Sequence, residues 1–170
     1  MINFRINIAG FMGPPVSLFA AYSHETDLLV IAKDPGAYDA SPRDGFLKIT
    51  NQSRDASYDA LFDNDNMADA IKAYFEMESL RLVTIRADVV RHTPGSKIER
   101  DGFSDTGVKY RISPDMTSGQ VAVMVACLYA SQQKGVSAAL SFADDMIFVG
   151  DDIAPHIKSE RDRLREWGML

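Results

Sequence analysis

The segment TSGQVAVMVACLYASQQK, residues 117–134, constrains the fold of this chain more than any other stretch. Thr117 and Gln120 have the spacing of a capping box, in which each side chain accepts the free N–H of the other residue at a helix N-terminus. Gly135 stands where a helix C-cap is expected. Valine, alanine, methionine and leucine occupy nearly every side of this predicted helix. A helix that is apolar all round is buried, so the other elements must surround it.

Strands are predicted mainly before this helix. In residues 2–8, INFRINI, apolar and polar side chains alternate with period two, which is typical of a strand with one buried face. Residues 16–22 form either a strand or a short helix. Apolar and β-branched runs bounded by turn residues predict further strands, at 28–32, 46–50, 80–90, 107–113 and 146–150.

Two further helices are predicted. The first covers 63–79, where Asn64 or Asn66 can cap it and an apolar stripe is formed by Met67, Ile71, Tyr74 and Phe75. The second starts at Asp152, is amphipathic and closes the chain. Because strands cluster early and do not alternate regularly with helices, we predict one α+β domain over 1–170. Its sheet is mixed or antiparallel and is packed by about three helices.

Two aspartate pairs in SFADDMIFVGDD, residues 141–152, are the candidate metal ligands: Asp144, Asp145, Asp151 and Asp152. Asp-Asp between apolar strands resembles the hairpin with which reverse transcriptases hold two divalent metals. A chain of 170 residues with a net charge of −6 has neither the size nor the cations to grip a nucleic-acid duplex. We therefore predict a turn at Asp144 and Asp145 and a helix N-cap at Asp151 and Asp152.

The other chemistry-bearing residues form no known motif. His24, His92 and His156 are isolated, and the chain has no zinc, phosphate-loop or dinucleotide signature. Cys127 lies within an apolar run, which favours a core residue over a nucleophile. A single cysteine allows no disulfide within the chain, as is usual in reducing compartments, so we predict a cytoplasmic protein. Because no cofactor-binding motif is present, we also predict no cofactor. The sequence selects no catalytic residue.

Charge is unevenly distributed along the chain. Residues 24–78 contain 12 acidic and 5 basic residues, whereas residues 80–111 contain 7 basic and 4 acidic residues. Either these are solvated surface charges, or they form an acidic and a basic face for a partner or a second copy. The two blocks and the mixed charges of the closing helix predict a homodimer, since most small oligomers are two-fold symmetric.

These observations favour a small soluble protein that binds another macromolecule without catalysis. An inhibitor, an adaptor or an assembly factor of the kind that phages and mobile elements carry would fit. We expect a protein partner rather than nucleic acid because the net charge is negative, and no membrane, because no apolar run reaches the roughly 20 residues that cross a bilayer. The alternative is a Mg²⁺-dependent hydrolase or nucleotidyl-transferring enzyme that uses the four aspartates.

Overall fold

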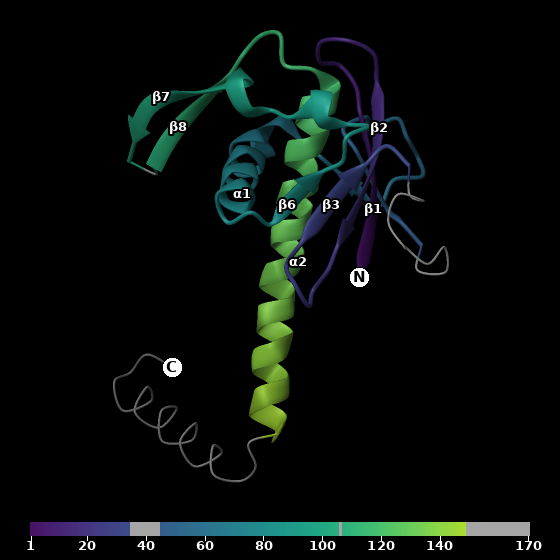
Figure 1. The fold of residues 1–170 in the computed structure, drawn as a ribbon, viewed down its shortest axis with the longest axis vertical. Coiled ribbons are helices and arrows are strands. Elements are labelled where there is room, and N and C mark those ends of the chain that lie inside the picture. Colours follow the sequence, from purple (N-terminus) through teal and green to yellow (C-terminus); the bar gives the residue numbers. More distant parts are fainter. Residues whose placement is uncertain (35–44, 106, 149–170) are drawn as a thin grey trace. The chain divides into compact units, whose positions relative to one another are not determined.

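The computed structural model describes residues 1–34, 45–105 and 107–148, and Figure 1 shows their arrangement. The strands are β1 (Ile2–Ile8), β2 (Val16–Tyr22), β3 (Leu29–Ala32), β4 (Leu47–Thr50), β5 (Ala60–Leu61), β6 (Val83–Ile85), β7 (Ile98–Ser104) and β8 (Gly107–Ile112). The helices in these ranges are α1 (Met67–Ser79) and α2 (Ser118–Phe148), with short 3₁₀ turns η2 (Asn64–Asn66), η3 (Val90–His92) and η4 (Gly95–Lys97). The chain divides into two compact units, Met1–Gln132 and Gln133–Leu170. One domain over the whole chain stays a prediction.

Six strands form a mixed sheet in the order β5-β4-β1-β2-β3-β6. β1 pairs antiparallel with β2, from Ile2 opposite Tyr22 to Ile8 opposite Val16, and β2 pairs antiparallel with β3. The pairs β1–β4, β4–β5 and β3–β6 are parallel. All strands of this sheet except β2 therefore point in the same direction. The mixed sheet and the separate β7–β8 hairpin confirm the predicted α+β class and decide that residues 16–22 form a strand.

One face of the sheet is covered by α1 and α2 (Figure 1). Phe4, Ile6 and Ile8 of β1 point to this face and are buried, as their alternation predicts. α2 supplies the centre of the core, because each side chain from Val121 to Leu128 is at least nine-tenths buried. The predicted buried helix is thus confirmed, and its burial of apolar surface is a main source of stability. Neither described helix combines the length and the apolar composition that crossing a bilayer requires.

α2 begins where the sequence predicts but ends later. Thr117 N–H donates to Gln120 Oε1 at 2.9 Å, and Gln120 N–H donates to Thr117 Oγ1 at 3.3 Å, so the capping box is confirmed. Gly135 does not end the helix, which continues to Phe148. A glycine inside a helix costs only about 1 kcal/mol relative to alanine, and the following VSAALSFA contains good helix formers and no proline. The predicted C-cap is therefore wrong.

The same continuation of α2 overturns two predictions at its end. Asp144 and Asp145 lie within the helix and not in a turn, and residues 146–148 are helical and not part of a strand. An aspartate inside a helix costs at most about 0.7 kcal/mol relative to alanine, so two of them do not end a helix of this length. Asp151, Asp152 and the predicted closing helix lie outside the described residues.

α1 confirms the predicted helix but differs in its cap and in its buried face. Asp63 caps the preceding turn η2 by accepting the N–H of Asp65 at 3.1 Å, whereas Asn66 makes no side-chain cap bond. Met67 and Phe75 are only half-buried. The buried face of α1 consists instead of Ala70, Ile71, Ala73, Tyr74 and Met77.

Residues 80–104 differ most from the sequence-based expectation. Only Val83–Ile85 forms a strand in the predicted 80–90 segment. The sequence does not indicate β7, because charged residues interrupt its alternation, yet β7 pairs with β8 as a hairpin. Tyr110 of β8 stacks on Phe75 of α1 with ring centroids 5.7 Å apart, which attaches the hairpin to the helix. Phe103 of β7 is 82% exposed.

Candidate binding site at the carboxyl edge of the sheet

Five strands end at one edge of the sheet, which we call the carboxyl edge, because only β2 runs in the opposite direction. The loop after β1 meets the start of α2 here. Met12 N–H donates to Met116 O at 3.0 Å, and Ser118 N–H donates to Met12 O at 3.2 Å. In Figure 1 this edge is the upper end of β1, away from the N-terminus. In sheets with parallel strands, ligands bind beyond the carboxyl ends, so this edge is the first candidate for a site.

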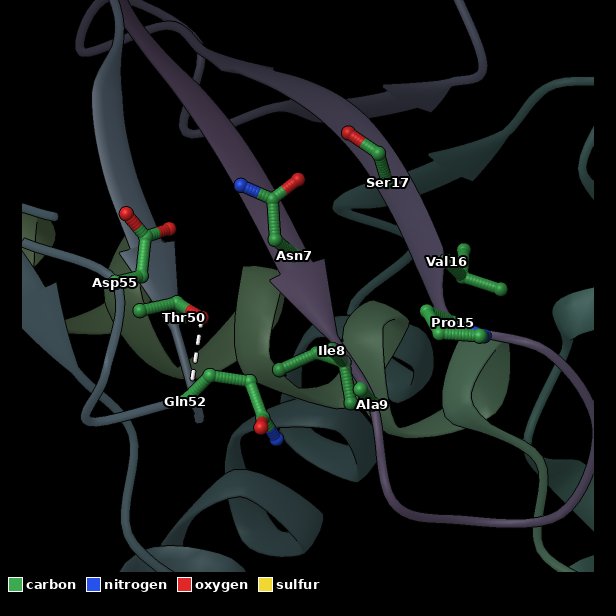
Figure 2. Close-up of a pocket in the computed structure, with 9 residues that line it drawn as sticks. All are labelled: Asn7, Ile8, Ala9, Pro15, Val16, Ser17, Thr50, Gln52 and Asp55. Carbon is green, nitrogen blue, oxygen red and sulfur yellow. Dashed lines mark hydrogen bonds between the residues drawn. The ribbon is translucent and has the colours of Figure 1, made fainter. Parts of the chain in front are cut away.

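A first hollow at this edge, the Asn7 hollow, has a cavity volume of about 380 Å³. Asn7 of β1 lies between Thr50 of β4 and Ser17 of β2, with which it is in register (Figure 2). Pro15 and Val16 form an apolar wall beside these polar side chains. Asn7, Thr50 and Ser17 belong to the sheet face opposite the helices, because Ile6 and Ile8 point to the core. The hollow is thus a polar floor with one apolar side.

Asp55 lines the Asn7 hollow, and its carboxylate is already paired with neighbouring residues of the chain. The Lys48 ammonium lies 2.7 Å from one Asp55 carboxylate oxygen, and the Ser57 N–H and hydroxyl donate to the other at 3.1 and 2.9 Å. The ammonium and the two donors favour the charged form and lower the pKa of Asp55 to about 2. Because its charge is already paired, this ionised carboxylate is a weak candidate for general acid–base chemistry.

A second hollow, the Arg91 hollow, consists of two adjoining cavities of about 170 and 280 Å³. Both cavities are lined by Pro14, Val16, Arg91 and His92. The smaller cavity extends toward Lys33 and Asp88, and the larger one extends toward Met12, Thr117 and Gly119. The Arg91 hollow adjoins the Asn7 hollow, with which it shares Pro15, Val16 and Ser17.

The backbone that carries Arg91 is held in place from several sides. Val89, which is 1% exposed, anchors η3 in the core. His92 N–H donates to Val89 O at 2.9 Å, and Thr93 N–H donates to Val90 O at 3.1 Å. Gln120 of the capping box donates from Nε2 to Thr93 O at 3.3 Å, so the turn is tied to the first turn of α2. Arg91 therefore extends from a fixed position.

The two cations of the Arg91 hollow have no acidic partner in the described part of the chain. The ion pairs there join Lys48 to Asp55 and Lys97 to Asp115. Asp88, the one carboxylate among the described residues that line this hollow, accepts the backbone N–H of Lys33 at 3.0 Å. The Nε–H of Arg91 donates to His92 Nε2 at 3.4 Å. Within the described residues, no acidic group pairs with the ammonium of Lys33 or with the terminal nitrogens of Arg91.

His92 packs directly on the first turn of α2. A Cβ added to Gly119 would overlap the His92 ring, so any larger residue at this position would force the imidazole to move. Partial burial and the neighbouring Arg91 charge lower the pKa of His92. The ring is therefore neutral at pH 7 and adds no charge to the hollow.

The residues that the sequence singled out lie elsewhere. Asp144 and Asp145 are consecutive residues of α2 and do not sit on a hairpin. Among the described residues, no three His, Cys, Asp or Glu side chains come together in a way that could hold a metal ion. Cys127 is buried as predicted, and desolvation raises the pKa of its thiol to about 12, so it stays protonated.

The sequence contains one signal for the Arg91 hollow in the positions of its cations. Lys33 follows a predicted strand, and Arg91 and His92 directly follow another. If the two strands are parallel, both end at the same edge of the sheet, and Lys33, Arg91 and His92 lie close together there. The sequence does not give the strand directions.

Comparisons with known proteins identify no relative. No protein-family model matches the chain, and no curated protein and no solved structure was found to be similar to it. Function therefore rests on the chemistry of the site, because a fold alone does not imply an activity.

Proposed function

We propose that this protein acts without catalysis, by binding another protein through the carboxyl edge of its sheet. One observation carries the proposal: exposed apolar and cationic side chains line the Arg91 hollow or directly neighbour its lining residues. Met12 and Val90 are 56% and 59% exposed, and Arg91 lies beside Val90. Methionine and arginine are enriched in protein interfaces. The residues that contribute most to binding cluster in pockets near the centre of an interface. An inhibitor, an adaptor or an assembly factor would need such a surface.

The chemistry of the described residues supports binding rather than catalysis. The buried, protonated Cys127 is not a nucleophile. Asp55 is ion-paired, and the Nε2 of His92 already accepts a hydrogen bond from Arg91. A catalytic site would need a nucleophile and a base in contact. The lone thiol also supports a cytoplasmic location.

Site-specific photo-cross-linking in the native host tests this proposal. A photoreactive amino acid replaces Met12 or Val90 in the full chain, and Glu76, an exposed residue of α1, is the control position. We expect one protein to be cross-linked from Met12 and from Val90 but not from Glu76. A third position, Phe103, tests the hairpin. Cross-links from Phe103 alone would overturn the proposal, because the partner would then bind the β7–β8 hairpin.

A second copy of the chain is a candidate partner, as the acidic and basic blocks predict. Sedimentation equilibrium at low and at high salt tests the homodimer. We expect a dimer at low salt that weakens at high salt, because exposed charges are screened. A monomer under both conditions rejects the dimer, and a dimer unaffected by salt rejects its electrostatic origin.

A further inference from the structure

We infer that the Arg91 hollow is a subsite for a carboxylate that an acidic side chain of the protein partner supplies. This inference rests on the proposed function and identifies the chemistry of one contact within it. The subsite is formed by Lys33 and Arg91 on the hollow that Pro14 and Val16 line.

The charges of the hollow call for one negative group. Lys33 and Arg91 are cationic, and Asp88 is the one carboxylate among the described residues that line it. These described residues therefore carry a surplus of one positive charge, since His92 is neutral. A carboxylate carries one negative charge, whereas a phosphorylated side chain carries about 1.5 to 2 at pH 7. Charge balance favours the carboxylate.

The donors of the hollow also suit a carboxylate. The guanidinium of Arg91 presents a planar pair of terminal N–H groups that matches the two oxygens of a carboxylate. On the other side, Thr117 accepts the N–H of Gln120 at Oγ1, which leaves its hydroxyl hydrogen to be donated to a ligand. A carboxylate beside Arg91 could thus receive hydrogen bonds from charged and neutral donors.

The apolar walls of the Arg91 hollow strengthen the ion pair between Arg91 and a bound carboxylate. Ion pairs on an open surface contribute little because water screens them. Here the apolar side chains of Pro14, Val16 and Met12 line the cavities and would displace part of the water around a bound carboxylate. The turn that carries Arg91 is already fixed by its bonds to Val89 and to Gln120, so little order is lost when a ligand binds.

A titration of the full chain with sodium acetate, followed by ¹H–¹⁵N NMR, tests the inference. We expect saturable shifts of the amide signals of Arg91, His92 and Gly119. Acetamide, which has the same shape without the charge, should cause none. Inorganic phosphate should bind no more tightly than acetate. Sodium chloride at equal ionic strength is the reference for general salt effects.

Two variants and a matched control identify the residues responsible. Arg91→Gln and Lys33→Gln should each weaken acetate binding about tenfold, as loss of a charged hydrogen bond predicts, without moving the denaturant midpoint. Lys97→Gln removes a cation that is paired with Asp115 and should leave the titration unchanged. Shifts that sodium chloride reproduces, or that persist in Arg91→Gln, would overturn the subsite, as would tighter binding of phosphate.

The acetate titration and the cross-linking experiment together distinguish failure of the carboxylate subsite from failure of the proposed function. Cross-linking at Met12 without acetate binding keeps the protein interface and rejects the carboxylate subsite. Acetate binding without any cross-link keeps an anion site but rejects its use by a protein partner, which overturns the inference as stated.

Discussion

The interior around α2 and the carboxyl edge meet at the first turn of one helix, yet they are built in opposite ways. From Val121 to Leu128, α2 is apolar and buried on all sides. At the carboxyl edge, by contrast, Arg91 and Lys33 are exposed and have no acidic partner among the described residues. Stability is thus concentrated in the core, while the edge presents charged groups on a rigid support, as binding sites require.

The boundary between the two regions is the turn from Thr117 to Gln120. The capping box pairs the N–H groups of Thr117 and Gln120 at the start of α2, and the same Gln120 side chain donates to the carbonyl of Thr93. Gly119 lets His92 approach the helix. Changes in the core, at the boundary and at the edge should therefore have decreasing effects on stability.

The largest effect is expected in the core. Val125→Asp should abolish soluble, folded protein, because an unpaired charge in the interior costs several kcal/mol, and whole domains are stable by only about 5–15 kcal/mol. Circular dichroism and the soluble yield measure the outcome. The control is Gln132→Asp, at an exposed position of the same helix. Near-normal stability of Val125→Asp would contradict the central position of α2.

A smaller loss is expected where core and edge meet. Gly119→Ala places a methyl group against the His92 ring and should destabilise the protein by about 1–3 kcal/mol, as overpacking usually does. Urea denaturation measures the change. Adding His92→Ala to Gly119→Ala removes the overlapping ring and should restore part of the loss. If the two changes are simply additive, the contact between these residues is not the cause.

Removing the cap should cost less. Thr117→Ala deletes the oxygen that accepts the N–H of Gln120 and should lower the free energy of unfolding by about 1 kcal/mol. Thr117→Ser keeps the acceptor and should behave almost as the unchanged chain. An equal loss in both variants would show that the methyl group of Thr117, rather than the cap, contributes the stability.

The smallest effect should appear as a pH dependence at the edge. The pKa of His92 is lower in the folded chain than the ordinary value of about 6.5, so the unfolded chain binds a proton more readily. Stability should therefore fall as the pH drops below about 6.5 toward the folded pKa. NMR titration of the His92 ring and denaturation between pH 7 and 5 measure both quantities. In His92→Gln this component of the slope should vanish; an unchanged slope would assign it to other groups.

The candidate site was the least predictable part of the molecule. Lys33, Arg91 and Thr117 are far apart in the sequence, and no sequence motif links them. The four aspartates were conspicuous, but Asp144 and Asp145 became part of a longer helix. A segment rich in aspartate therefore does not locate a metal site unless a local structural motif accompanies it.

The α+β class, the alternation of β1 and the capped start of α2 follow from the amino-acid sequence alone. These features depend on periodicity and on hydrogen bonds between near neighbours, such as Thr117 and Gln120. That five of the six strands run in one direction, and that Lys33 and Arg91 line one hollow, became known only from the folded chain. Strand order and direction depend on pairing between distant segments, and no local pattern in the chain encodes which distant edges meet.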